Sequence, residues 1–197
     1  MVSHLLYLHG FRSSPQSTKA RRLAAWVACH RPDLVWWCPA LPPSPRQAMA
    51  EVLAGIAHWP GDGLAVVGSS LGGFYASVVA EARGCPAVVI NPAVNPARDL
   101  ARHIGQQSVW HDPDQAFYFR PEYIDELNQL TPPQLTRPQR YAALIARGDE
   151  LLDWREMAER HAGARLRLIE GSDHALSDFD THLPFLLDFL QLTPPCD

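Results

Sequence analysis

Residues 64–73 read LAVVGSSLGG, and they carry the strongest structural signal in the chain. An apolar run is followed by the pattern Gly68-x-Ser70-x-Gly72 and then by a segment compatible with a helix. A strand, a tight turn and a helix in that order form the context in which this pattern marks a nucleophile elbow. Glycine suits the positions two before and two after the serine, because a sharp turn there leaves room only for very small side chains. The pattern therefore predicts a serine hydroxyl raised at the end of a buried strand.

Short apolar runs alternate with helical patterns along the rest of the chain. The runs are continuous rather than alternating, which is typical of strands buried on both faces of a parallel sheet. This order predicts an α/β fold of three layers, with a mostly parallel sheet of about six strands in the middle. The expected strands are 4–8, 34–38, 64–67, 87–90, 142–146 and 165–169, and the expected helices are 17–29, 45–57, 70–82, 154–161 and 181–190.

The segment from about residue 91 to residue 140 interrupts this alternation. It is rich in proline and aromatic side chains, and its length is uncommon for a plain loop in a compact domain. We expect a lid or cap with short helices, inserted in a single domain of residues 1–197 and lying over the carboxyl edge of the sheet. The alternative is an excursion that packs on the fold and has only a structural role.

Composition limits the class of protein. A hydrophobic fraction of 47% is ordinary for a globular chain of 197 residues. The net charge of −4 and the absence of a long lysine or arginine run speak against a nucleic-acid partner or a membrane-surface partner. No apolar run has the length of a membrane span, and the first residues lack the basic region of a signal peptide, so we expect a cytoplasmic protein.

Neither a metal nor an organic cofactor is expected. The segment His111-Asp112-Pro113-Asp114 is a weak metal candidate, because polar residues in a proline-rich loop are more often solvated. Nothing resembles a glycine loop for a dinucleotide or a phosphate. The cysteines form no C-x-x-C pair and are interpreted as reduced thiols, with extracellular disulfides as the less favoured alternative. They are Cys29, Cys38, Cys85 and Cys196.

His174 is the expected general base. A serine hydroxyl needs a base to accept its proton and a third group to orient that base. After a nucleophile elbow these partners follow in the order serine, acid, histidine, beyond the ends of later strands. His174 stands in a small-residue loop after the last expected strand, and a helix follows. The histidines without this context are His4, His9, His30, His58, His103, His111, His161 and His182.

Asp149 is the expected acid of this set. It follows the strand 142–146 in a turn that begins with glycine, where an orienting carboxylate should stand. Asp153 is the runner-up, and its alternative role is to cap the next helix. Two neighbouring acids are less favoured, and these are Glu150 and Asp173.

Two backbone N–H groups are expected to form an oxyanion hole, since acyl transfer develops negative charge on the substrate oxygen. The N–H of Leu71 directly follows the serine and opens a helix, whose positive end favours negative charge. The loop after the first strand should supply the second donor. Its His9-Gly10-Phe11 pattern makes the Phe11 N–H the candidate, and Gly10 allows the backbone to approach closely.

These segments together resemble the α/β-hydrolase superfamily and, more narrowly, the small bacterial YqiA-like esterase family. The resemblance spans nearly the whole chain. It implies a trimmed α/β-hydrolase core without the earliest strands of larger relatives. It also implies hydrolysis of carboxylic esters or thioesters by Ser70, Asp149 and His174. The segments that carry the resemblance are residues 7–15, 68–76, 91–94, 148–153 and 171–174.

The resulting hypothesis is a serine hydrolase of the carboxylesterase type that forms an acyl-enzyme intermediate on Ser70. Two departures from the family pattern are Arg12, where asparagine is frequent, and Ser172, where glycine is frequent. A near alternative is a thioesterase acting on acyl-coenzyme A, which a basic patch would favour. A binding module on a hydrolase scaffold is less favoured, because candidates for all three catalytic roles are intact. The candidates for the basic patch are Arg12, Lys19, Arg21 and Arg22.

Overall fold

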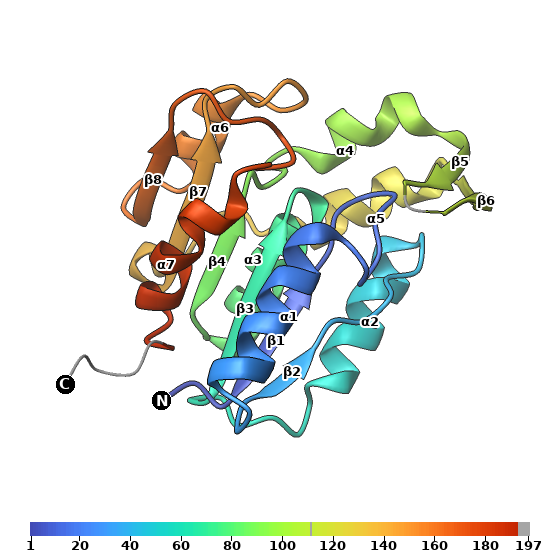
Figure 1. Ribbon diagram of the computed structural model, residues 1–197. Helices are drawn as coiled ribbons and strands as arrows, with labels where there is room; N and C mark the ends of the chain where they lie inside the picture. Colours follow the sequence, from blue (N-terminus) through green and yellow to red (C-terminus); the bar gives the residue numbers. More distant parts are fainter. Residues whose placement is uncertain (111, 193–197) are drawn as a thin grey trace.

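A parallel six-stranded sheet forms the centre of the molecule (Figure 1). The computed structural model describes residues 1–110 and 112–192, and the strands of the sheet within them run in the order β2-β1-β3-β4-β7-β8. The mostly parallel sheet of about six strands predicted from the sequence is thus confirmed. The strands are β1 His4–Leu8, β2 Val35–Trp37, β3 Leu64–Ser69, β4 Ala87–Ile90, β7 Tyr141–Ala146 and β8 Arg165–Ile169.

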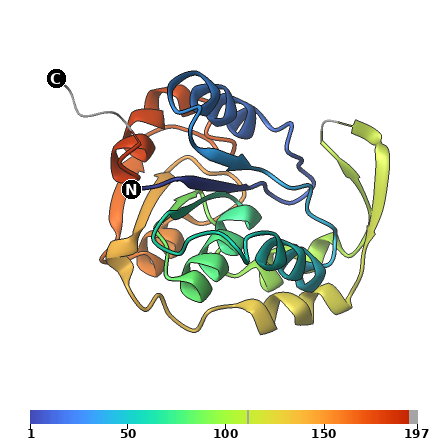
Figure 2. The ribbon, with the colours of Figure 1, turned by 90° about the horizontal axis from the view of Figure 1, so that it is seen from below.

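Helices cover both faces of this sheet, and Figure 2 shows the three layers from below. One face carries α1 and α7, and the other carries α2, α3 and α6. Each of these helices turns an apolar stripe toward the sheet, as the spacing of apolar residues along it predicts. Their bounds are α1 Thr18–His30, α2 Pro45–Gly55, α3 Leu71–Arg83, α6 Trp154–Arg160 and α7 Phe179–Phe189.

The central strand β1 explains why the strands read as continuous apolar runs. Successive side chains of a strand point to opposite faces. Leu5 and Tyr7 join the core beneath α1 and α7, whereas Leu6 and Leu8 join the core beneath α2 and α3. All four are fully buried, so the strand has no polar face.

The edge strand β8 departs from the expectation that every strand is buried on both faces. Residues 165–168 are exposed, and only Ile169 at its end is buried. The reason is its position, because β8 pairs with β7 alone and is the last strand of the sheet. Arg165 and Arg167 place charge on this edge, which discourages pairing with another chain.

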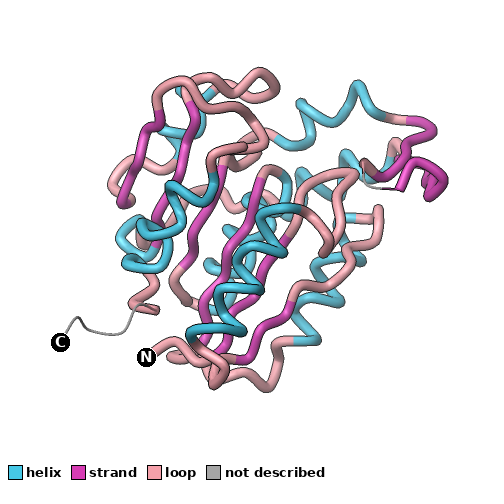
Figure 3. Tube along the Cα trace, viewed as in Figure 1, coloured by secondary structure: helices cyan, strands magenta, loops and turns pink. Residues whose placement is uncertain are grey.

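The segment between β4 and β7 combines short helices with a hairpin, as Figure 3 shows. Short helices were expected there, but the antiparallel hairpin of β5 and β6 was not. The polar run Gln106-Gln107-Ser108 of β5 carries no apolar strand pattern, which explains the omission. The hairpin lies at the right of Figures 1 and 2, and α5 packs against α2. The elements are α4 Pro96–Leu100, η1 Ala101–His103, β5 Gly105–Val109, β6 Asp112–Phe119, α5 Glu122–Leu130 and η2 Pro138–Arg140.

Membrane-spanning helices are not found: no helix within the described residues is both long enough and apolar enough to cross a bilayer.

His161 should make the stability of the fold depend on pH. It is 2% exposed and donates a hydrogen bond from Nδ1 to the carbonyl oxygen of Met157 at 2.9 Å. Burial lowers its pKa from 6.5 to about 4. Because the unfolded chain binds this proton more readily, the stabilisation is complete above about pH 6.5 and declines as the pH falls toward 4. The expected decline is roughly 3 kcal/mol.

Urea unfolding of the wild type and of His161→Phe at pH 7.5, 6, 5 and 4.5 would measure this contribution. As the pH falls, the unfolding free energy of the wild type should decrease more than that of the variant, because phenylalanine does not titrate. A difference that stays constant across this range would contradict the prediction.

Candidate active site

The turn after β3 holds Ser70 in a backbone conformation that L-residues rarely adopt. Its φ is 57° and its ψ is −122°, and α3 begins at the next residue. Gly68 and Gly72 make the turn possible. A Cβ on Gly68 would lie 2.0 Å from the carbonyl oxygen of Gly72, and a Cβ on Gly72 would lie 2.0 Å from that of Leu8. The strand, turn and helix thus raise the Ser70 side chain at the carboxyl edge of the sheet.

His174 and Asp149 lie next to this serine. The Nε2 atom of His174 is 3.0 Å from Ser70 Oγ, and its Nδ1 atom is 2.7 Å from Asp149 Oδ2. An Nδ1–H that donates to the carboxylate leaves Nε2 free to accept the serine proton. The side chain of Asp149 is 0% exposed and that of His174 is 15% exposed. The structure therefore brings together the three side chains that the sequence pointed to, because parallel strands end at one edge.

Backbone amides fix the orientation of the Asp149 carboxylate. Its Oδ1 atom accepts hydrogen bonds from the N–H groups of Leu151 at 2.9 Å and Leu152 at 2.8 Å, so that Oδ2 faces His174. Asp153, the runner-up, instead caps α6 by accepting a hydrogen bond from the N–H of Arg155 at 2.9 Å. The structure thus places Asp149, and not Asp153, beside the histidine.

Asn91 holds the loop that carries His174, a role that the sequence analysis missed. It is fully buried directly after β4 and has a φ of 41°. Its Nδ2 group donates to the carbonyl oxygens of Asp173 and His174, both at 3.0 Å. Its Oδ1 atom accepts from the N–H of Ala146 at 2.8 Å, at the end of β7. The sequence does contain a clue to this role. An asparagine that lies between a buried strand and a proline is itself buried, so its side-chain amide needs hydrogen-bond partners.

Glu150 supports the same loop, although the sequence analysis considered it only as a less favoured acid. Its Oε2 atom accepts a hydrogen bond from the backbone N–H of His174 at 3.0 Å. On the other side of His174, the Nζ group of Lys19 donates to the carbonyl oxygen of Ala175. Burial lowers the pKa of Lys19 to about 8. The backbone of the His174 loop is therefore held from several sides.

Leu71 and Phe11, the expected oxyanion donors, line one cavity beside the serine. As the first residue of α3, Leu71 has no acceptor for its N–H within the helix. The N–H of Phe11 makes no backbone hydrogen bond within the described part of the chain. Gly10 brings this loop against the nucleophile, since a Cβ on Gly10 would lie 3.2 Å from Ser70 Cβ.

Arg12 ties this loop to the hairpin of β5 and β6. Its Nε–H donates to the carbonyl oxygen of Ser108 at 2.7 Å, and its guanidinium lies 4.1 Å from the ring centre of Trp110. The N–H of Trp110 donates in return to the carbonyl oxygen of Arg12 at 2.8 Å. The ring of Phe11 meets that of Phe119 edge-on at 5.1 Å. The inserted segment therefore braces the loop that carries the Phe11 N–H.

The candidates for a basic patch have partners within the protein. Arg12 binds the hairpin and Lys19 binds the His174 loop. Arg22 forms an ion pair with Asp180 at 3.6 Å, and both side chains are exposed. Arg21 is also exposed. Three of the four basic side chains thus have partners within the protein, and their positions do not require the phosphates of coenzyme A as a ligand.

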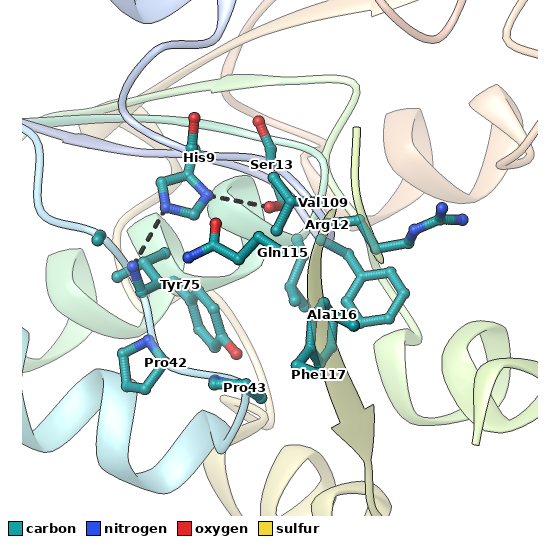
Figure 4. A pocket seen from close by; sticks show the side chains of 16 residues that line it. His9, Arg12, Ser13, Pro42, Pro43, Tyr75, Val109, Gln115, Ala116 and Phe117 are labelled. Carbon is teal, nitrogen blue, oxygen red and sulfur yellow. Dashed lines mark hydrogen bonds between the residues drawn. The ribbon is translucent and has the colours of Figure 1, made fainter. Parts of the chain in front are cut away.

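A cavity of about 240 Å³ lies beside the nucleophile (Figure 4). Its walls come from four segments: the loop after β1, residues 40–43, the first turns of α3, and the hairpin of β5 and β6. His9 joins two of them, because its Nδ1–H donates to the carbonyl oxygen of Gly10 at 3.1 Å and its Nε2 accepts from the N–H of Leu41 at 3.2 Å. Burial lowers the pKa of His9, which favours the neutral ring that these two bonds require.

The described residues contain no cluster of side chains that could hold a metal ion. Within residues 1–110 and 112–192, no three histidine, cysteine or acidic side chains gather as a metal would need. His111, part of the weak metal candidate, lies outside the described residues, as does Cys196. The other three cysteines are free thiols.

Solved structures with the same fold include proteins of diverse origin. The α/β hydrolase domain-containing protein 10 from mouse is 16% identical, with a TM-score of 0.69 over 96% of this chain and 91% of that one. Est1E from Butyrivibrio proteoclasticus is 12% identical, with a TM-score of 0.68 over 96% and 89%. A structure from the study of LipS and LipT, two metagenome-derived lipolytic enzymes, is 17% identical, with a TM-score of 0.68 over 96% and 94%.

At the level of sequence, the model of one family matches residues 4–191, which is nearly the whole chain. That family is described as an uncharacterised protein family, UPF0227. The protein therefore belongs to the UPF0227 family, and it has the fold of α/β hydrolases.

Proposed function

We propose that this protein is a serine hydrolase of the carboxylesterase type. The observation that carries the proposal is the pair of contacts that joins Ser70 to His174 at 3.0 Å and His174 to Asp149 at 2.7 Å. A serine on a strained turn, a histidine with a free Nε2 and a buried carboxylate form the arrangement that activates a hydroxyl for acyl transfer. The lipolytic enzymes with the same fold are in keeping with this proposal.

The first half of the reaction forms an acyl-enzyme. Ser70 Oγ attacks the carbonyl carbon of the ester while His174 Nε2 accepts the hydroxyl proton. The negative charge that develops on the carbonyl oxygen is stabilised by the N–H groups of Leu71 and Phe11. When the carbon–oxygen bond to the leaving group breaks, His174 donates its proton to the departing alcohol.

The second half releases the acid. A water molecule gives a proton to His174 and attacks the acyl carbon, and the second tetrahedral intermediate collapses as His174 returns the proton to Ser70 Oγ. Asp149 keeps the imidazole in the tautomer with hydrogen on Nδ1 and stabilises the imidazolium formed in each half. A thioester would follow the same steps with a thiol as the leaving group.

Hydrolysis of p-nitrophenyl acetate, butyrate and octanoate, together with labelling by a fluorophosphonate probe, tests the proposal. An activated serine should be labelled at Ser70, and the labelled protein should lose its esterase activity. Butyryl-coenzyme A is measured in the same series. A kcat/KM higher for butyryl-coenzyme A than for p-nitrophenyl butyrate would indicate a thioesterase, and a lower one an esterase. Absence of both labelling and hydrolysis would overturn the proposal and favour a binding module.

Asp149→Asn should lower kcat by about 1,000-fold while KM changes little. The amide can donate to Nδ1 and so favours the wrong tautomer, in which Nε2 carries hydrogen and cannot accept the serine proton. Asp153→Asn, at the cap of α6, is the matched control and should retain most of the activity. Steady-state kinetics on p-nitrophenyl butyrate decide the matter. Equal losses in the two variants would contradict the role given to Asp149.

A further inference from the structure

We infer that the cavity beside Ser70 selects short acyl groups that carry a hydroxyl or carbonyl oxygen beyond the reacting carbon, and that the Tyr75 hydroxyl recognises this oxygen. The inference rests on the proposed function and specifies its substrate class. It is carried by the position of the cavity, by its size, and by a tyrosine hydroxyl that faces the cavity without a hydrogen-bond partner among its walls.

The cavity takes the acyl part of the substrate rather than the leaving group. His174 must protonate the leaving oxygen, so the leaving group lies on the side of that histidine. Neither His174 nor Asp149 lines the cavity, which is instead bordered by Leu71 and Phe11, the two proposed oxyanion donors. An acyl chain that extends away from the carbonyl carbon on this side enters the cavity.

The size of the cavity limits the acyl group. A volume of about 240 Å³ lies below the range that is usual for sites of drug-sized ligands. A cavity of this size favours acyl chains of four or five carbons, with room for a polar substituent, over chains as long as octanoyl.

The Tyr75 hydroxyl is a polar group that faces this cavity from an otherwise buried side chain. Tyr75 lies one helical turn after Leu71, on the same face of α3. The residue is 3% exposed, and its hydroxyl points into the cavity, toward the space between Pro43 and Phe117 (Figure 4). It makes no hydrogen bond with any of the other residues drawn there, which are the walls of the cavity.

Tyr75 acts here as a neutral hydrogen-bond donor and acceptor. Burial and the nearby Glu126 raise the pKa of its hydroxyl, so the phenol does not ionise near neutral pH. Most of the surrounding side chains offer no partner, since Phe11, Leu41 and Phe117 are apolar. Gln115 of β6, which also lines the cavity, extends toward His9 (Figure 4).

This arrangement penalises a purely hydrocarbon acyl chain. The hydroxyl can hydrogen-bond to water when no substrate is bound, but a bound acyl chain displaces water from around it. An alkyl group then leaves the Tyr75 hydroxyl buried without a partner, which weakens binding by roughly ten- to a hundredfold. An oxygen in the chain replaces the lost water contact, and sites of this kind discriminate strongly against analogues that lack the polar group.

The test compares two pairs of p-nitrophenyl esters, butyrate with 3-hydroxybutyrate and pentanoate with 4-oxopentanoate. For the wild type, kcat/KM should favour at least one oxygenated ester over its plain partner by about tenfold or more. Tyr75→Phe should bring that ratio close to one, by losing activity on the oxygenated ester and gaining it on the plain ester. Tyr118→Phe, at an exposed tyrosine of the hairpin outside the cavity, is the matched control and should keep the wild-type ratio.

The ratio separates recognition from a structural role, because a general distortion of α3 lowers turnover of both esters of a pair alike. A wild-type ratio of one or less for both pairs overturns the inference, as does an unchanged ratio in Tyr75→Phe. Should Tyr75→Phe not fold, the wild-type ratios and product inhibition test the inference instead. 3-Hydroxybutyrate should then inhibit the wild type at a lower concentration than butyrate does. Either failure, with Ser70-dependent hydrolysis intact, leaves the proposed function standing. Absence of hydrolysis and of fluorophosphonate labelling would instead remove the proposed function.

Discussion

Ser70→Ala should lower kcat/KM for p-nitrophenyl butyrate by about 100,000-fold, and His174→Ala should lower it by a similar factor. The alanine variant has no oxygen to attack the ester, and without the imidazole the serine hydroxyl keeps its proton. The double variant should lose little more than either single variant, because the two side chains act as one unit. The residual rate should reflect the N–H groups of Leu71 and Phe11, which the substitutions leave in place.

Steady-state kinetics on all three variants, with active-site labelling of the wild type to count functional sites, measure this non-additivity. Ser77→Ala is the control, because Ser77 lies in the same helix and its hydroxyl only donates to the carbonyl oxygen of Gly73. If the losses in the single variants multiplied in the double variant, the two residues would act independently, and the proposed proton transfer between them would be wrong. Near-normal activity of Ser70→Ala would point to a different nucleophile.

Gly72→Ala should destabilise the whole protein by at least about 3 kcal/mol or prevent folding. A Cβ at this position would lie 2.0 Å from the carbonyl oxygen of Leu8 and 2.7 Å from that of His9. These are backbone atoms at the end of β1, so no flexible side chain can move aside. The start of α3 would have to move away from β1. The N–H group of Leu71 on α3 would then move away from that of Phe11 in the loop after β1, and the proposed oxyanion hole would be lost.

Chemical unfolding of Gly72→Ala and Gly61→Ala, followed by circular dichroism, checks this prediction. Gly61 is the matched control, since a Cβ there meets no atom within 4 Å and its backbone angles suit other residues. Its variant should stay within about 0.5 kcal/mol of the wild type. Equal stability of the two variants would mean that α3 can shift away from β1 without cost, which contradicts the close approach that Gly72 permits.

Local sequence patterns were sufficient for the main elements of the fold and for the candidate site. The bounds of β1 and β4 agree with the expected runs, because an apolar run of strand length between turns reports its own burial. The bounds of β8 also agree, although most of this strand is exposed. Ser70, Asp149 and His174 were each identified from a turn that follows a strand. Since parallel strands end at the same edge of a sheet, chain order alone indicates that such turns are neighbours.

Other features depend on contacts between distant segments, which no local pattern records. The strand β5 is polar, and its pairing with β6 defines it rather than burial of an apolar face. The exposure of residues 165–168 follows from the place of β8 at the end of the sheet, where it has a neighbouring strand on one side only.

Some side chains around the site could likewise be identified from the sequence, whereas the roles of others depend on contacts between distant segments. The residue types that follow each strand can be read from the sequence, and they make a serine, an acid and a histidine available at one edge. The three-dimensional structure was needed to show that Asn91 holds the His174 loop, that Arg12 binds the hairpin, and that the Tyr75 hydroxyl faces a cavity. The physical reason is that a hydrogen bond or an apolar contact between segments needs a defined distance and direction, and packing alone sets these.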